Sequence, residues 1–230
     1  MKKSMWAIIL AVGIAMSGAF VYMGIKKFAE KDRCVTVKGL SEREVLANMA
    51  TWPMTVSVEG NDLISLFEEA DRKKDIVIKF LKDNNFTDKE IAVSSIDTND
   101  RWSYDYEEAR KKHKDRYRVD LRITVTTRQV DRLIETLGKQ IDLLKHGIDI
   151  STDDWQVEYE YVDLSSLKPE MVEEATKNAR KVAEKFAEDA DCELGSIFNA
   201  TQGQFTIEDV YRRPQYKNIR VVTTVAYYLK

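Results

Sequence analysis

The sequence of 230 residues predicts an α+β fold, in which three long helices pack on a mostly antiparallel sheet. One N-terminal transmembrane or signal helix is expected to precede this fold. Several short segments alternate apolar and polar residues, as strands with one buried face do. Three longer segments repeat apolar residues at helical spacing. Only 9 Gly and 3 Pro interrupt the chain, which favours long elements with short connections.

The N-terminal helix is expected because no charged residue occurs from Met5 to Ile25. A helix of this length is about 30 Å long, enough to cross the hydrocarbon core of a bilayer. Trp6 and Tyr22 lie near its ends, where aromatic rings favour the membrane interface. We therefore expect residues 1–30 to form a membrane anchor and residues 31–230 to form an α+β domain.

A cleaved signal peptide is the alternative for residues 1–30. Ser17-Gly18-Ala19 provides the small residues that signal peptidases prefer, and cleavage there would remove residues 1–19. Lysines flank both ends of the apolar stretch, so charge alone does not set its orientation in the membrane.

Strict alternation predicts the strands. It is clearest at residues 119–126, where Val119, Leu121, Ile123 and Val125 alternate with polar residues. Further strands are expected at residues 35–39, 54–58, 91–95, 155–161, 194–197 and 219–229. Gly39 is expected to bend the first of them. The last strand would offer backbone groups to a second subunit if it formed the edge of its sheet.

The three helices are expected at residues 63–81, at residues 128–144 and from Pro169 to Ala190. Asn61 or Asp62 can cap the first helix, and proline suits the first turn of the third. The third helix carries a regular apolar stripe, which we expect to be buried; it includes Ala179, Val182, Ala183 and Phe186.

The composition excludes several classes of protein. With 36 basic and 39 acidic residues the net charge is −3, which argues against a nucleic-acid partner. Two cysteines cannot form a four-thiolate zinc site, and two histidines leave little material for a multi-histidine metal centre. The sequence contains neither a phosphate-binding glycine loop nor the Gly-x-Ser-x-Gly motif of a nucleophilic serine. We therefore expect no enzymatic activity, no cofactor and no metal.

Cys34 and Cys192 are the first candidate functional pair. In an oxidising compartment they could form a disulfide or serve a redox protein, although sequence does not supply the distance that a disulfide requires. Alternatively, Cys192 packs as a small apolar residue at a helix end.

Six basic residues form the second candidate site: Arg110, Lys111, Lys112, Lys114, Arg116 and Arg118. Such a cluster could contact anionic lipid or an anionic envelope polymer. Acidic residues precede it between Asp97 and Glu108. The favoured interpretation is therefore a solvated hairpin whose two arms carry opposite charge and pair across the strands.

Five segments resemble the SIMPL-domain family of bacterial envelope proteins, a largely uncharacterised family of the oxidative-stress-defence type. They are Val35-Thr-Val-Lys-Gly39, Met54-Thr-Val-Ser-Val58, the helical stretch 175–187, Cys192-Glu-Leu-Gly-Ser-Ile197 and the strand 219–226. The resemblance covers residues 34–230 as a pattern of elements. It implies an extracytoplasmic α+β domain that often self-associates and is linked loosely to stress protection. It brings no active site with it.

These observations favour a non-enzymatic domain of the bacterial cell envelope, anchored through residues 5–25 and exposed outside the cytoplasm. A homo-oligomer and a second envelope protein are the expected partners, and the sequence identifies no ligand. Secretion to the periplasm after signal cleavage, a redox role for the cysteines and anionic-polymer binding through Arg110–Arg118 remain the alternatives.

Overall fold

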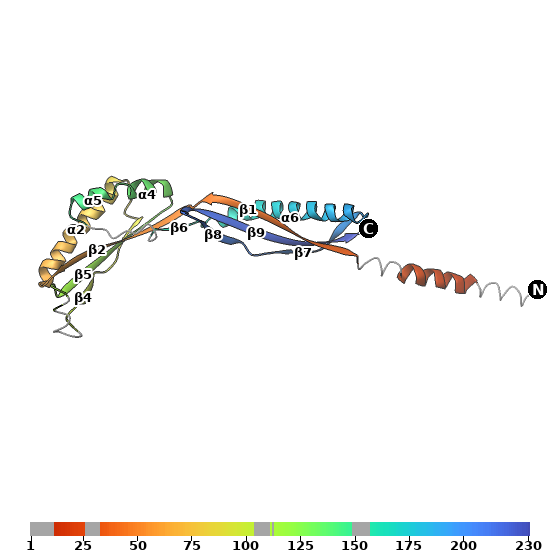
Figure 1. Ribbon diagram of the computed structural model, residues 1–230, viewed down its shortest axis with the longest axis horizontal. Coiled ribbons are helices and arrows are strands. Elements are labelled where there is room, and N and C mark those ends of the chain that lie inside the picture. Colours follow the sequence, from red (N-terminus) through yellow and green to blue (C-terminus); the bar gives the residue numbers. More distant parts are fainter. Residues whose placement is uncertain (1–11, 26–32, 104–110, 112, 149–156) are drawn as a thin grey trace, which may run out of the picture. The chain divides into compact units, whose positions relative to one another are not determined.

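The computed structural model describes residues 12–25, 33–103, 111, 113–148 and 157–230 (Figure 1). A helix covers residues 12–25. The strands are β1 (Cys34–Leu46), β2 (Met49–Gly60), β3 (Ile91–Val93), β4 (Asp97–Asp100), β5 (Tyr117–Thr127), β6 (Glu158–Glu160), β7 (Leu194–Gln202), β8 (Thr206–Val210) and β9 (Arg213–Leu229). The helices are α2 (Leu63–Asp83), α4 (Val130–Leu137), α5 (Ile141–Lys145) and α6 (Leu164–Asp189).

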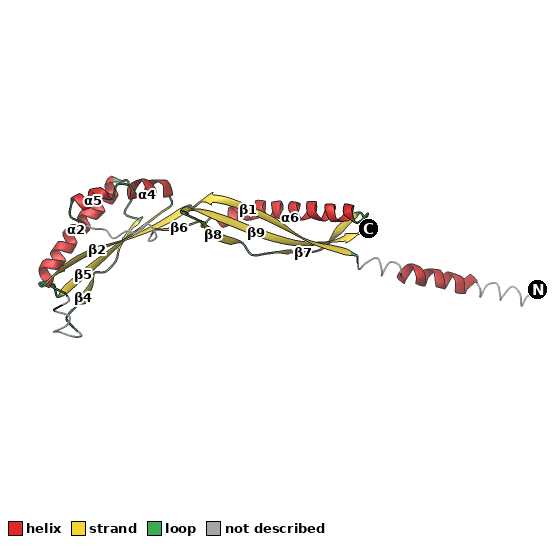
Figure 2. Ribbon diagram, in the orientation of Figure 1, coloured by secondary structure: helices red, strands yellow, loops and turns green. Residues whose placement is uncertain are grey.

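The chain divides into two compact units. Unit 1 contains the residues up to Arg43, residues 165–207 and residues 218–230. Unit 2 contains residues 44–164 and 208–217. The chain contains both helices and antiparallel sheets, as the sequence predicts (Figure 2).

Unit 2 is built on a five-stranded antiparallel sheet in the order β3-β5-β2-β6, with β4 also paired to β5. The strand β5, expected from its alternation, pairs with β2 over their full lengths, from Ala50 opposite Thr127 to Gly60 opposite Tyr117. Val119, Leu121, Ile123 and Val125 are buried and their polar neighbours are not, so the alternation is confirmed.

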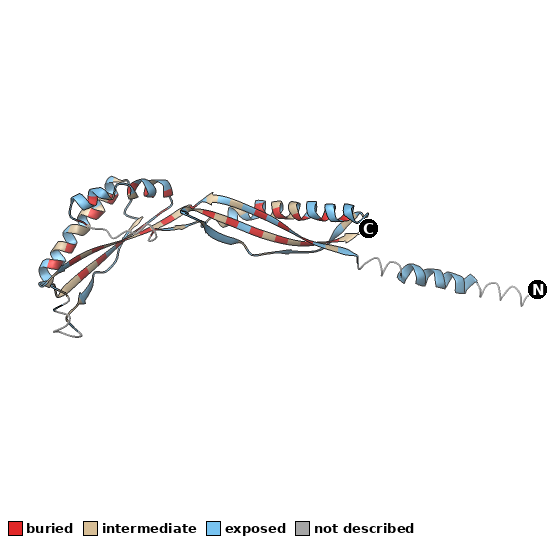
Figure 3. Ribbon diagram, viewed as in Figure 1, coloured by how far each residue is buried: buried red, intermediate tan, exposed pale blue. Residues whose placement is uncertain are grey.

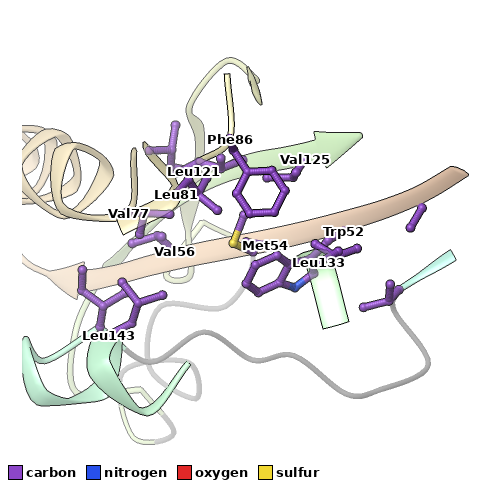
Figure 4. Close-up of a cluster of buried hydrophobic side chains, with 14 of the residues drawn as sticks. Trp52, Met54, Val56, Val77, Leu81, Phe86, Leu121, Val125, Leu133 and Leu143 are labelled. Carbon is purple, nitrogen blue, oxygen red and sulfur yellow. The ribbon is translucent and has the colours of Figure 1, made fainter. Parts of the chain in front are cut away.

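The core of unit 2 lies between this sheet and its helices (Figure 4). Trp52, Met54 and Val56 project from β2 toward Val77 and Leu81 of α2. The carboxylate of Asp62 caps α2 by accepting a hydrogen bond from the Ser65 N–H at 3.2 Å, which confirms one of the two expected capping residues.

The second expected helix is broken. Instead of one helix over residues 128–144, α4 ends at Leu137 and α5 begins at Ile141. Gly138 forms the C-cap of α4, and its N–H donates to the Ile134 carbonyl. Glycine weakens a helix interior, and the break lets Leu133 and Leu143 both reach the core.

Unit 1 contains most of a second sheet, in the order β1-β9-β7, with β8 also paired to β9. The helix α6 covers one face, where Ala179 and Ala183 pack with Val37, Val225 and Tyr227. The strand β1 continues through Gly39 to Leu46. The missing side chain of Gly39 allows contact with α6, because a Cβ on Gly39 would lie 1.9 Å from the Ala175 carbonyl oxygen.

The buried stripe of α6 differs from the expected one. It consists of Met171, Ala175, Ala179, Ala183 and Ala187, at intervals of four residues (Figure 3). Val182 and Phe186 are 41% and 56% exposed, so the prediction that both are buried is wrong. Four residues exceed one helical turn of about 3.6 residues, so a stripe with this spacing rotates slowly around the helix axis. Near the C-terminal end of α6 the buried direction has therefore moved away from the side on which Phe186 lies. The helix also starts at Leu164 rather than near Pro169.

The C-terminal strand β9 lies inside its sheet. It pairs with β1 on one side and with β7 and β8 on the other, so it is not an edge. The longer extents of β1 and β7 and the presence of β8 were not expected from the sequence. The helix over residues 12–25 is exposed at every position. Within the described ranges, no helix combines the length and the apolar character that crossing a membrane requires.

Candidate binding surfaces

A cleft in unit 2 has a volume of about 1190 Å³. Its apolar floor is formed by Ile134 and Leu137 of α4 together with Val157. The strand β6 and the hairpin between β8 and β9 supply the other walls. A hydrogen bond of 2.8 Å from the Ala47 N–H to the Gln215 carbonyl fixes the hairpin within the unit, and both guanidinium nitrogens of Arg213 pair with Glu44 at 2.8 Å.

Acidic and basic residues both line this cleft: Glu158, Glu160, Asp209, Arg212 and Lys217. Glu158 and Glu160 are exposed on β6, and Asp209 accepts a hydrogen bond from Lys217, which is only 6% exposed. Among the described strands β6 ends the order of its sheet, so its outer edge can accept a further strand. The cleft therefore combines an apolar floor, two carboxylates without a partner among the described residues, and an open sheet edge.

The hairpin tip adds an aromatic side chain to the cleft. Tyr211 is 81% exposed, and the Arg212 guanidinium lies 5.1 Å from its ring centre. Arg212 has a φ of 60°, a left-handed conformation that few non-glycine residues adopt. Sequence reasoning missed this site. The run Tyr-Arg-Arg-Pro at 211–214 was the available signal, since proline and charged residues between strand patterns mark a turn.

The basic cluster forms part of the hairpin between β4 and β5. Asp100 lies opposite Tyr117 in the strand register, and the Arg116 guanidinium donates to the Asp100 carboxylate at 2.7 Å. These bonds hold the pKa of Asp100 below its ordinary value. Arg118 pairs with Asp120 at 2.9 Å. Opposite charges thus pair across the hairpin at Arg116, as the favoured interpretation expects, whereas Arg118 and Asp120 pair within β5.

The rest of the cluster is less constrained. Lys111 and Lys114 are exposed, and Arg110 and Lys112 lie outside the described residues. Contact of this cluster with an anionic surface stays a prediction.

The two cysteines lie at one end of the sheet of unit 1. Cys34 starts β1 and is exposed, whereas Cys192 precedes β7 and is half-buried. Both thiols are free, and β9 lies between β1 and β7. A disulfide between them in solution stays the alternative to free thiols.

A polar cluster around Glu90 joins three parts of unit 2. The Glu90 carboxylate accepts hydrogen bonds from Arg132 at 2.6 Å, from Thr127 at 2.5 Å and from the Thr87 N–H at 2.9 Å. The Arg132 guanidinium also lies 4.5 Å from the ring centre of Phe86. Burial alone would raise the pKa of Glu90, but these hydrogen bonds outweigh it and lower the pKa.

The Glu90 carboxylate is engaged with its own neighbours, so we assign the cluster a structural role, although the buried Arg132 Nε has no hydrogen-bond partner among the described residues. Elsewhere in the described ranges, no group of three or more His, Cys, Asp and Glu side chains is placed to hold a metal ion.

The fold and these surfaces define a class of protein: an α+β chain with antiparallel sheets and an exposed apolar helix at its start. The model of the SIMPL family, described as a protein of unknown function (DUF541), matches residues 35–223. The chain belongs to this family, which confirms the resemblance seen in its sequence. A search of curated proteins gave no match.

Proposed function

We propose that this protein is a non-enzymatic domain of the bacterial cell envelope, tethered to a membrane through residues 5–25, with residues 31–230 outside the cytoplasm. In this proposal the domain self-associates and binds a second envelope protein. A contribution to protection against oxidative stress is part of the proposal and rests on the family resemblance alone.

The helix over residues 12–25 carries the proposal. All its side chains are exposed, including Ile14 at 65%, Phe20 at 71% and Ile25 at 65%. Leaving so many large apolar side chains in water is unfavourable by about 25 cal/mol for each Å² of apolar surface. Insertion of the uncharged stretch 5–25 into a bilayer would cover them. Residues 5–11 of this stretch lie outside the described residues.

Labelling of Cys34 can test on which side of the membrane residues 31–230 lie, because this exposed residue follows shortly after the apolar stretch. We expect a membrane-impermeant maleimide to label the mildly reduced full-length chain in intact spheroplasts. A chain carrying Cys34→Ser and Cys192→Ser is the matched control for background labelling. Labelling that required lysis of the spheroplasts would place the domain in the cytoplasm and refute this part of the proposal.

Self-association is supported by the face of the sheet in unit 1 that lies opposite α6. Leu40 is 39% exposed on this face. Homo-oligomers generally repeat one such patch around a symmetry axis. We expect light scattering of residues 31–230 to give a mass above that of the monomer across a tenfold range of concentration. A monomeric mass throughout would remove self-association from the proposal.

The cleft of unit 2 supports a protein partner. Its β6 edge favours an extended segment, and the carboxylates of Glu158 and Glu160 favour one that carries Lys or Arg. We expect Glu158→Lys combined with Glu160→Lys to abolish a cross-link that the unchanged chain forms with an envelope protein. The matched control is Glu173→Lys on α6, also an exposed carboxylate. Equal cross-linking by all three chains would exclude the cleft as the partner site.

A further inference from the structure

Four large apolar side chains are exposed around one end of unit 1. They are Val182 and Phe186 on α6 and Ile197 and Phe198 on β7, and their exposed fractions are 41%, 56%, 52% and 57%. We call these four residues the apolar collar. They are not needed for the core of the unit, because the alanine stripe of α6 and the buried side chains of β9 form it.

Backbone hydrogen bonds place the collar at the end where β1 begins (Figure 1). The Leu229 N–H donates to the Arg33 carbonyl, which joins the start of β1 to the end of β9. The Cys192 N–H donates to the Ala187 carbonyl, one residue after Phe186. In the register of β7 and β9, Ile197 lies opposite Tyr227, near the C-terminus.

The collar residues point to more than one side of this end. Ile197 lies opposite Tyr227, which is buried on the α6 face of the sheet, whereas the Phe198 ring contacts Tyr228 on the other face. Val182 and Phe186 line a shallow groove of about 350 Å³ on α6. A patch that binds one protein partner would lie on one side of unit 1. The collar residues are instead distributed around one end of the unit, which suits contact with the planar surface of a membrane.

The groove on α6 has the side chains of an interfacial site. Lys181, Lys185 and Asp189 flank its apolar residues, and the Lys185 ammonium pairs with Glu188 at 2.9 Å. Lysine can lay its alkyl stem along apolar surface while its ammonium group stays in the polar layer, and aromatic rings favour the same depth.

The length of the chain before β1 limits how far this end can lie from a membrane. Residues 26–32 separate the apolar stretch from Arg33, and a fully extended segment of this size reaches at most roughly 25 Å. The headgroup layer occupies about 5–8 Å of that distance on each side of a bilayer. An anchored chain would therefore keep Arg33, at the collar end of unit 1, within roughly 20 Å of the headgroup surface.

We infer that the apolar collar contacts the boundary between lipid headgroups and acyl chains and seats this end of unit 1 on the bilayer. The inference rests on the proposed tether. It adds a second lipid contact to the chain, formed by the folded domain itself. The two contacts together fix the height of unit 1 above the membrane.

The test uses the full-length chain with Phe186→Trp, reconstituted in phosphatidylcholine vesicles that contain brominated lipids. The matched control is Ile207→Trp, since Ile207 is 41% exposed in the same unit but lies on β8, which pairs with the other end of β9. Emission of the native tryptophans is subtracted by using the unchanged chain. We expect bromine near the headgroups to quench the tryptophan at 186 more than bromine near the chain ends, and the tryptophan at 207 to be unaffected by both.

Three results would overturn the inference, and they separate its failure from that of the tether. If the chain resists alkaline extraction but positions 186 and 207 are equally unquenched, the collar does not touch lipid. If position 186 is shielded from aqueous iodide only as the ratio of protein to lipid rises, without bromine quenching, a second copy covers the collar. If alkaline carbonate releases the chain, the tether fails and the inference fails with it.

Discussion

The close approach of β1 to α6 at Gly39 makes a sharp prediction about unit 1. A Cβ at this position would lie 1.9 Å from the Ala175 carbonyl oxygen, 2.5 Å from the Ala179 nitrogen and 2.9 Å from the Ala179 Cβ. Ordinary contacts begin near 3.4 Å, so α6 would have to move by about 1.5 Å in the Gly39→Ala variant. Two of the three obstructing atoms belong to the helix backbone and cannot turn aside.

The expected magnitude follows from two opposing effects. Overpacking of a core costs about 1–3 kcal/mol and occasionally more, and rigid backbone neighbours favour the upper end of that range. Replacing glycine also restricts the unfolded chain, which returns about 0.4–1 kcal/mol. We therefore expect Gly39→Ala to lower the free energy of unfolding by about 2 kcal/mol. At about 4–8 °C per kcal/mol for a unit of this size, the Tm should fall by roughly 8–16 °C.

The assay is thermal unfolding followed by circular dichroism, with hydrogen exchange to locate the change in unit 1. Gly60→Ala is the matched control, because Gly60 also lies in a strand but its nearest neighbour is the flexible end of Leu66, at 3.1 Å. We expect the control to change the free energy of unfolding by less than about 1 kcal/mol. Equal Tm values for the two variants would refute the close packing of β1 against α6.

Three further predictions address the Glu90 cluster, the surface of α6 and the cysteines. Because hydrogen bonds lower the pKa of Glu90 in the folded state, its contribution to stability should be complete above the unfolded pKa of about 4.3 and decline as the pH falls through the folded value. Glu90→Gln should lower the free energy of unfolding by about 2 kcal/mol at pH 7 and reduce its decline at acid pH. An unchanged dependence of the free energy of unfolding on pH would mean that the Glu90 cluster does not contribute to stability. Phe186→Ala should change stability by less than about 0.5 kcal/mol in urea unfolding, while Ala183→Leu should cost about 1–3 kcal/mol, and the reverse order would contradict the observed stripe. Titration of thiols should find both Cys34 and Cys192 without reductant, and their appearance only after reduction would reveal a disulfide.

Local sequence patterns were sufficient to predict the helices and strands whose two faces differ in burial. The strand β5 was predictable because one face lies on the core and the other does not, so alternation appears directly in residues 119–126. By contrast, β7 and β8 are mostly exposed on both faces, so no alternation marks them. The C-cap at Gly138 was also not predictable from the pattern, because apolar residues continue on both sides of it.

Features that depend on distant neighbours could not be read from local patterns. Glycine in a strand can mark a bend or a close approach, and the helix residues that decide between them at Gly39 lie far along the chain. The same holds for Phe186, because the alanine stripe and the stripe through Phe186 differ by one residue in helical phase. The cleft of unit 2 was missed because it combines β6 with a hairpin distant in sequence.

Membrane retention of the full-length chain tests the central proposal most directly. Membranes containing the unchanged protein are extracted with alkaline carbonate, and the retained chain is measured by intact mass. A tether through residues 5–25 predicts that the chain of 26.6 kDa stays intact in the membrane pellet. Release of the intact chain into the supernatant would contradict the tether. The mass of a shorter chain that begins near Phe20 would instead show that residues 1–19 are a cleaved signal peptide.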